Sequence, residues 1–249
     1  MNKAKLFDEI RPMFGGTMNV AQVAGVSVLL DAAQSSGVTD IWHVANILAQ
    51  VKHETGGHMS PIKETVMPSH KDKNPSDATV IKRLDQAYAK GQLSWVKKPY
   101  WRDGWFGRGP VQVTHKDNYA KVGKAIGVDL VANRNLALDA KVGARIAVIG
   151  MRDGLFTGRK LANYNFPGAL DLAPADNPRR IINGNDGTDA KIAQSTRAFV
   201  RALTDSGFMA VSSKPVAAGK PPEAVATAKP NWLAQIIAAI VAAFRGTRK

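Results

Sequence analysis

The sequence contains no cysteine in its 249 residues. This excludes a disulfide framework, a thiolate metal site and a cysteine nucleophile. Acidic residues are also scarce, because 20 Asp and Glu face 34 Lys and Arg, which gives a formal net charge of +14. Such a charge favours anionic partners, and nucleic acid, anionic lipid and acidic wall polymers all qualify.

Long apolar runs are missing as well. The first eleven residues carry charges where a signal peptide needs an apolar stretch, so we expect no signal peptide and export by another route. The longest apolar run, Trp232 to Phe244, would span about 20 Å as a helix, which is too short for a bilayer core of about 30 Å. Basic residues are dispersed and no nucleic-acid-binding motif is present, so we expect no nucleic-acid partner.

Composition divides the chain into three parts. Residues 1–210 have the mixed composition of a folded domain. Residues 211–230 are rich in Pro, Ala and Lys without periodicity, which is typical of a linker. Residues 231–249 are predicted to form a short apolar helix with a basic tail. That helix either lies in a membrane interface, with Trp232 and the tail at the headgroups, or docks on the domain or on a partner chain.

Apolar periodicity and capping residues predict a mainly helical domain with little sheet. The predicted helices cover residues 19–36, 41–54, 77–90, 114–127, 136–151, 178–182 and 189–205. Their expected amino-terminal caps are Asn19, Thr39-Asp40, Asp77, Thr114, Asn135 and Asn177. Residues 111–113 alternate apolar and polar side chains and predict a short extended segment.

Glu54 ends the apolar stripe of the helix predicted at residues 41–54. Gly56-Gly57 follows it and is a strong stop signal, which puts Glu54 in the last helical turn. The negative end of the helix dipole and the apolar surroundings both raise the pKa of a carboxyl there. A carboxyl that stays protonated near neutral pH suits a general acid, whereas the alternative is an ordinary surface glutamate.

Glu64 lies ten residues after Glu54, across the glycine turn, so both carboxyls can face one cleft. Two carboxyls are the minimal set for glycoside hydrolysis, although such a pair alone is common. His53 and His58 invite a metal interpretation. They are five residues apart rather than the four of zinc proteases, so we expect neither a metal nor another cofactor.

The segment from residue 106 to 119 contains glycines, which let a ligand approach the backbone closely, and polar side chains. Its glycine spacing matches neither a phosphate loop nor a dinucleotide fingerprint. Gln112, Thr114 and Asn118 can hydrogen-bond sugar hydroxyls and acetamido groups. The aromatics Trp101, Trp105 and Tyr119 either stack on sugars or pack in the core.

Three segments together resemble glycoside hydrolase family 19: His53-Glu54-Thr55-Gly56-Gly57, residues 106–114 with Asn118-Tyr119, and Arg180-Ile181-Ile182-Asn183-Gly184. The resemblance covers about residues 15–209. It implies a lysozyme-like, two-lobed, mainly α fold with a substrate cleft, and inverting hydrolysis of β-1,4 bonds between N-acetylated amino sugars. It also implies that Glu54 is the general acid and Glu64 the general base. The implied residues that hold substrate or water are Thr114, Gln112, Asn118, Asn183, Arg108, Tyr119 and, more loosely, Arg197.

The lack of cysteine and the segment from Phe14 to Gln22 resemble the phage-type wall hydrolases of this family. The resemblance implies an endolysin that waits in the host cytoplasm and acts on peptidoglycan from the periplasm. We further expect a monomer and, from the composition of residues 231–249, contact of that segment with the outer membrane or anionic lipid. A virion-associated lysin, a chitinase on the same scaffold and a non-catalytic module that binds the wall or a membrane remain alternatives.

Overall fold

The computed structural model describes residues 1–64, 71–94, 96–184 and 186–208. Its α-helices are α1 (Lys3–Ile10), α2 (Val20–Ser35), α3 (Ile41–Glu54), α4 (Asp77–Ala89), α5 (Lys116–Ile126), α6 (Ala140–Asp153) and α7 (Asp189–Asp205). Short 3-10 helices are η1 (Arg11–Phe14), η2 (Tyr100–Asp103), η3 (Arg134–Leu138), η4 (Leu161–Asn163), η5 (Gly168–Asp171) and η6 (Pro178–Ile181). Two short strands, β1 (Ile62–Lys63) and β2 (Arg108–Gly109), complete these elements. The predicted mainly helical class is confirmed.

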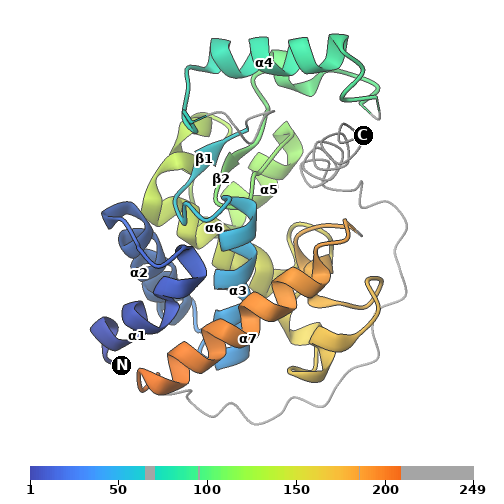
Figure 1. The fold of residues 1–249 in the computed structure, drawn as a ribbon. Coiled ribbons are helices and arrows are strands. Elements are labelled where there is room, and N and C mark those ends of the chain that lie inside the picture. The colour runs from blue at the N-terminus through green and yellow to red at the C-terminus, as the bar shows by residue number, and fades with distance from the viewer. Residues whose placement is uncertain (65–70, 95, 185, 209–249) are drawn as a thin grey trace, which may run out of the picture.

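Helix α3 lies at the centre of the fold, with α7 crossing it and α2 beside it (Figure 1). The amino terminus meets the far end of α7, where the Asn2 backbone N–H donates to the Ser206 carbonyl at 2.7 Å. Helix α4 lies at the opposite end of the molecule from α1 and α7, beyond the two strands (Figure 1). The carboxyl-terminal end of α3 therefore points toward the junction between the part that contains α1 and α7 and the part that contains α4.

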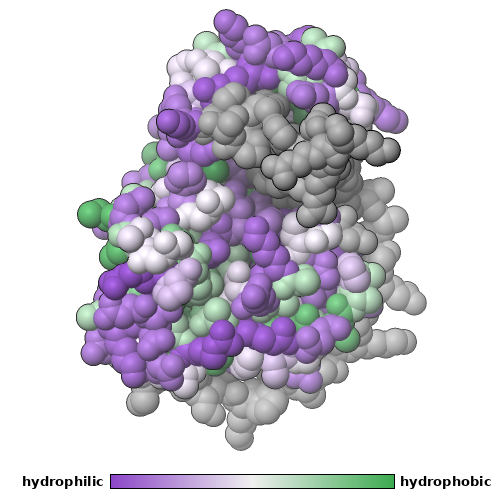
Figure 2. Space-filling model, viewed as in Figure 1, coloured by the Kyte–Doolittle hydropathy of each residue, from purple (hydrophilic) through white to green (hydrophobic). Residues whose placement is uncertain are grey.

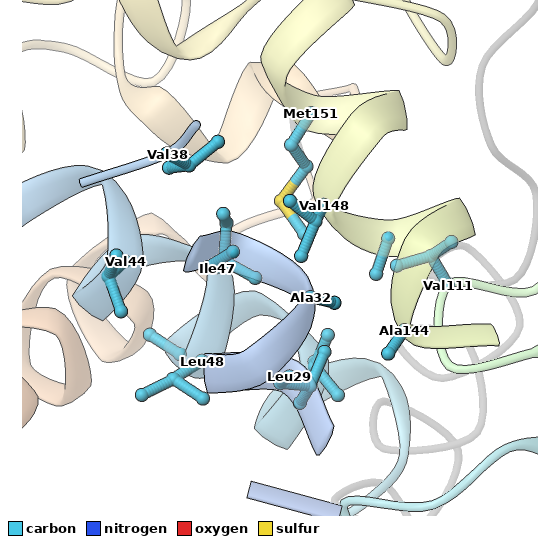
Figure 3. Close-up of a cluster of buried hydrophobic side chains, with 14 of the residues drawn as sticks. Leu29, Ala32, Val38, Val44, Ile47, Leu48, Val111, Ala144, Val148 and Met151 are labelled. Carbon is cyan, nitrogen blue, oxygen red and sulfur yellow. The ribbon is translucent and has the colours of Figure 1, made fainter. Parts of the chain in front are cut away.

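Two separate hydrophobic clusters form the core. The larger one joins α2, α3, α6 and α7, and Figure 3 shows Ala32, Ile47 and Val148 from three of these helices meeting inside it. The smaller one lies under α4, and its buried members are Val80, Leu84, Ala87, Leu93, Trp101 and Phe106. Because each part buries its own apolar side chains, the fold has two lobes, as the resemblance implies.

Strands β1 and β2 pair antiparallel, with Ile62 opposite Gly109. The Gln112 side chain fastens this pair, since its Nε2 donates to the carbonyls of Ile62 and Gly109, each at 2.8 Å. The prediction of an extended segment at residues 111–113 is wrong. Gln112 has φ +53°, which reverses the chain so that Val113 bridges back to Arg108.

Several predicted helix ends are confirmed by their capping contacts. Asn19 and Gln22 form a capping box at α2, and Asp40 accepts two backbone N–H groups at the start of α3. Asn177 caps η6 with Pro178 at its first position, although this helix is 3-10 rather than α. Helix α7 spans the predicted residues.

Other expected starts are wrong by a few residues, because a neighbouring side chain supplies the cap. Ser76 rather than Asp77 caps α4. His115, with φ +63°, precedes α5, so Thr114 is not a cap. Asp139 accepts the N–H groups of Lys141 and Val142, so α6 starts there and the segment after Asn133 forms η3 instead.

Helix α1 was not expected, because it is only eight residues long and its apolar face rests on Leu6 and Ile10, which are both fully buried. Among the described residues, none of the helices has the length and apolar character needed to cross a bilayer. The predicted linker at residues 211–230 and helix at residues 231–249 lie outside the described residues.

Candidate active site

Glu54 is the last residue of α3, as predicted, and only 4% of it is exposed. Gly56 and Gly57 follow with φ +58° and +84°, a conformation that glycine adopts without strain. The chain therefore leaves the helix directly after Glu54, and the carboxyl stays within the buried face of α3.

Arg179 faces Glu54 across the end of α3. Its Nη1 lies 2.7 Å from Glu54 Oε1 and donates to Gln50 Oε1 at 2.8 Å. Its Nη2 donates to Asp186 Oδ2 at 2.7 Å. Arg179 comes from η6, where Asn177 accepts its backbone N–H. The guanidinium thus joins two acids from distant parts of the chain in a buried cluster.

Burial raises the pKa of the Glu54 carboxyl above its usual value, while Arg179 opposes that rise and Asp186 adds to it. Burial acts in the same direction on Asp186, but Arg179 and Thr188 outweigh it and hold the pKa of Asp186 below its usual value. Asp186 therefore ionises first and balances the charge of Arg179. Glu54 can then keep its proton, which is the state that a general acid needs.

Asn183 belongs to the same cluster. It is 2% exposed, its Nδ2 donates to Asp186 Oδ2 at 3.1 Å, and its Oδ1 accepts the Gly184 backbone N–H at 2.7 Å. The structure thus brings Asn183 to the Glu54 side of the site. Both polar ends of its side chain already have partners, so its contact with a sugar stays a prediction.

Glu64 follows β1 and is fully buried. Its Oε2 accepts the Gly107 backbone N–H at 2.8 Å, and its Oε1 accepts the Tyr100 hydroxyl at 3.1 Å. Burial raises the pKa of Glu64 to about 8, although Gly107, Tyr100 and Arg108 favour the ionised form. Both carboxyl oxygens are held in place, so this group can act as a base once it has lost its proton.

Arg108 and Tyr119, expected to contact substrate, are instead buried in the protein, and this expectation is corrected. Arg108 is fully buried, pairs with Asp77 at 2.7 Å and stacks 3.8 Å from the Phe106 ring. The Tyr119 hydroxyl donates to the Phe106 carbonyl at 2.9 Å. A buried guanidinium needs compensating partners, and these interactions supply them, so both residues support the loop that carries Gly107.

The remaining sugar-binding candidates differ in how far they are exposed to solvent. Asn118 is exposed, whereas Gln112 and Thr114 are 3% and 6% exposed. The amide N–H groups of Gln112 donate to backbone carbonyls of the strand pair. They therefore hold the two strands together and are not free to bind a ligand. Trp101 is fully buried, with its Nε1 donating to Asp85, which excludes it as a sugar-stacking face in this structure.

Arg197 is not brought to the glutamates, and this expectation is also corrected. Its Nη2 pairs with Asp171 at 2.7 Å on the surface. The preceding residue, Thr196, accepts a hydrogen bond from Asn46, which lies eight residues, or about 12 Å, before Glu54 along α3. Arg179 occupies the place beside Glu54 instead.

No group of three or more potential metal ligands exists among the residues that the structure describes. His53 and His58, considered above as ligands, both have pKa values below the usual imidazole range, chiefly because of burial. For His53 the pKa falls to about 3, and the nearby cation of Arg179 contributes to this. The charged groups that the structure places around the two glutamates are Arg179 and Asp186 beside Glu54, and Arg108 near Glu64.

Sequence reasoning missed Arg179, Asp186 and Tyr100. The capping pair Asn177-Pro178 marked the turn in which Arg179 lies, but nothing in that motif indicates which way the next side chain points. Tyr100 is 36 residues from Glu64 and reaches it through tertiary packing. Arg179 and Tyr100 are identified only by their long-range contacts with Glu54 and Glu64, and Asp186 by its contact with Arg179.

The family described as class I chitinase, glycoside hydrolase family 19, matches residues 31–151. An acidic endochitinase of Petunia hybrida is 34% identical over 107 residues, covering 42% of this chain and 33% of that enzyme. Acidic endochitinase Q of Nicotiana tabacum is 41% identical over 59 residues, covering 23% of each chain. The chain thus spans a third or less of the length of these relatives.

Two solved structures also align with this chain. Chitinase C from Streptomyces griseus HUT6037 is 20% identical, with a TM-score of 0.46, covering 84% of this chain and 77% of that one. A bacterial family 19 chitinase is 21% identical, with a TM-score of 0.43, covering 85% of this chain and 97% of that one.

Proposed function

Because residues 31–151 match glycoside hydrolase family 19, we propose that this chain hydrolyses β-1,4 bonds between the N-acetylated amino sugars of peptidoglycan. Glu54 donates a proton to the leaving sugar oxygen. Glu64 takes a proton from the water that attacks the opposite face of the ring, which inverts the anomeric centre.

The observation that carries this proposal is the environment of Glu54. Its carboxyl is buried at a helix end, burial raises its pKa, and the one arginine beside it already pairs with Asp186. A surface glutamate that merely ends a helix has none of these features. General acids of glycosidases need a raised pKa of this kind.

The contacts of Glu64 support the role of base. The Gly107 N–H and the Tyr100 hydroxyl point at its two oxygens and stabilise the carboxylate once it forms. Arg108 adds a buried positive charge nearby, and Asp77 holds that charge in place. Asn118, which is exposed, and Thr114 remain the proposed contacts to sugar or water.

Charge favours peptidoglycan over chitin. Peptidoglycan carries carboxylates on its peptides, whereas chitin is neutral, and this chain has a formal net charge of +14. We assign it the role of an endolysin that degrades the wall at the end of a phage cycle. The relatives named above are chitinases, so chitin hydrolysis is the second candidate, and parallel assays on purified peptidoglycan and a chitin oligomer separate the two.

The test of the mechanism is Glu54→Gln, assayed on Gram-negative cells whose outer membrane has been permeabilised. Loss of a general acid lowers rates by about 10²- to 10⁴-fold, so lysis should nearly disappear while the circular dichroism spectrum stays unchanged. Glu9→Gln, an exposed glutamate on α1, is the matched control and should lyse normally. Near-normal lysis by Glu54→Gln would overturn the assignment.

A further inference from the structure

A pocket of about 330 Å³ opens beside the end of α3. Its walls come from η1, α2, the end of α3 and the first turns of α7, and the polar residues among them are Gln22, Lys52, His53, Lys191 and Ser195. Three of these elements, α2, α3 and α7, are labelled in Figure 1, and the space-filling view from the same side shows hydrophilic and apolar residues side by side (Figure 2). We call it the Lys52–Lys191 pocket.

Two lysines give this pocket a positive charge. Burial lowers the pKa of Lys52, and the nearby charge of Lys191 lowers it further, so the two ammonium groups repel each other across the pocket. Within the described part of the chain, neither lysine forms an ion pair with an acid. Lys52 rests instead over the Phe14 ring at 5.5 Å. An anion placed between the lysines would relieve their repulsion.

Neutral polar groups complete the lining. The Nε2 atom of His53 is buried and has no hydrogen-bond partner within the described residues. With its pKa near 3, His53 is neutral at the pH of the periplasm and can offer an N–H from the ring. A buried polar atom without a partner is costly, so a ligand that completes its hydrogen bonding gains affinity. The Ser195 hydroxyl is a further possible donor.

The pocket adjoins the proposed catalytic acid. His53 directly precedes Glu54, and the charges of Arg179 and Asp186, which surround Glu54, also act on His53. Lys52 lies two residues before Glu54, so its side chain leaves α3 on a different side from that of Glu54, and His53 lies between them. A substituent of two or three residues on the glycan reaches about 7 to 10 Å, which is the span that the inference requires between a sugar ring at Glu54 and the pocket.

We propose that the Lys52–Lys191 pocket binds a carboxylate carried by the glycan next to the bond that is cut, and so selects peptidoglycan over chitin. This inference rests on the proposed function and names what its site recognises beyond the sugar backbone. The carboxylate belongs to the peptide or, on a muramic acid that carries no peptide, to the lactyl group, and the experiment below distinguishes these two sources.

The experiment compares wild type with Lys52→Ala/Lys191→Ala on three substrates: peptidoglycan with its peptides, the same glycan stripped of peptides by an amidase, and a chitin oligomer. Partly exposed ion pairs are modest, so kcat/KM on intact peptidoglycan should fall about tenfold, through KM rather than kcat. The rate on the chitin oligomer should not change. A fall confined to intact peptidoglycan identifies the peptide carboxylates, whereas a fall on the stripped glycan, where the amidase has freed the lactyl carboxyl from its amide bond, identifies the lactyl carboxylate.

The matched control is Lys5→Ala/Lys90→Ala, which removes the same charge from two exposed positions on other parts of the surface. It separates pocket binding from general attraction and should leave kcat/KM within about twofold. Lys52→Arg/Lys191→Arg should keep most of the activity, since the charges remain. An unchanged KM on both peptidoglycan substrates, with wild type active on them, would overturn the inference alone, whereas an inactive wild type would overturn the proposed function.

Discussion

Two buried carboxyls carry the proposed chemistry, and their neighbours decide when each holds a proton. Burial raises the pKa of Glu54, and Asp186 already balances the charge of Arg179, which favours the protonated form of Glu54. Glu64 must lose its proton to act, against a pKa of about 8. At this scale the sequence predicted both residues and the raised pKa of Glu54. It did not predict Arg179, Asp186 or Tyr100, because Arg179 and Tyr100 reach Glu54 and Glu64 across the fold, and Asp186 pairs with Arg179.

The value of kcat/KM should therefore rise with pH as Glu64 ionises. This rise, the acidic limb of the pH profile, should lie near pH 8. Tyr100→Phe removes a hydroxyl that donates to the carboxylate, which disfavours the ionised form. The acidic limb should then move up by about one pH unit. Tyr88→Phe, which alters a ring packed against Trp101 in the same lobe, should leave the limb where it is. If the acidic limb of the Tyr100→Phe profile stays at the same pH or moves to a lower pH, Glu64 is not the base.

Helix ends position the site at the scale of elements. The stop at Gly56-Gly57 and the caps of α2, α3 and η6 follow local rules, so the sequence predicted them. The starts of α4, α5 and α6 depended on which of several adjacent polar side chains accepts the first N–H groups. Tertiary packing decides which side chain it is, so the prediction that Asp77, Thr114 and Asn135 are the caps was wrong.

Gly25 lets α2 approach the loop that follows Glu54. A Cβ at this position would meet the Met59 carbonyl oxygen at 2.0 Å, and backbone atoms cannot move aside as a side chain can. Gly25→Ala should therefore lower the free energy of unfolding by roughly 2 to 3 kcal/mol, despite the better helix propensity of alanine. Denaturant unfolding measures this. Gly168→Ala, where a Cβ meets nothing within 4 Å, should be nearly neutral, and equal effects of the two substitutions would contradict this close packing.

At the scale of the whole molecule, the mainly helical class and the two-lobed arrangement were predictable, because periodicity and the three family segments span most of the domain. The packing of α7 across α3 and the separate core beneath α4 were not predictable, since they depend on how whole elements meet. The predicted roles of residues 211–230 and 231–249 remain expectations from composition alone.

Deleting residues 231–249 tests the membrane role expected for them. The truncated chain should hydrolyse purified wall at the normal rate, because the proposed catalytic residues lie elsewhere, and should act more weakly on intact cells. Replacing Arg245, Arg248 and Lys249 with Gln separates the contribution of charge from that of the apolar run. Equal activity of the full and truncated chains on intact cells would remove the membrane role.

The most direct measurement of the central claim is mass spectrometry of purified peptidoglycan digested by the wild-type protein and by Glu54→Gln. The account predicts glycan fragments with new reducing ends from wild type, which also shows which of the two glycosidic bonds is cut, and almost none from the variant. Intact glycan strands after wild-type digestion, or equal fragment yields from the two proteins, would contradict it.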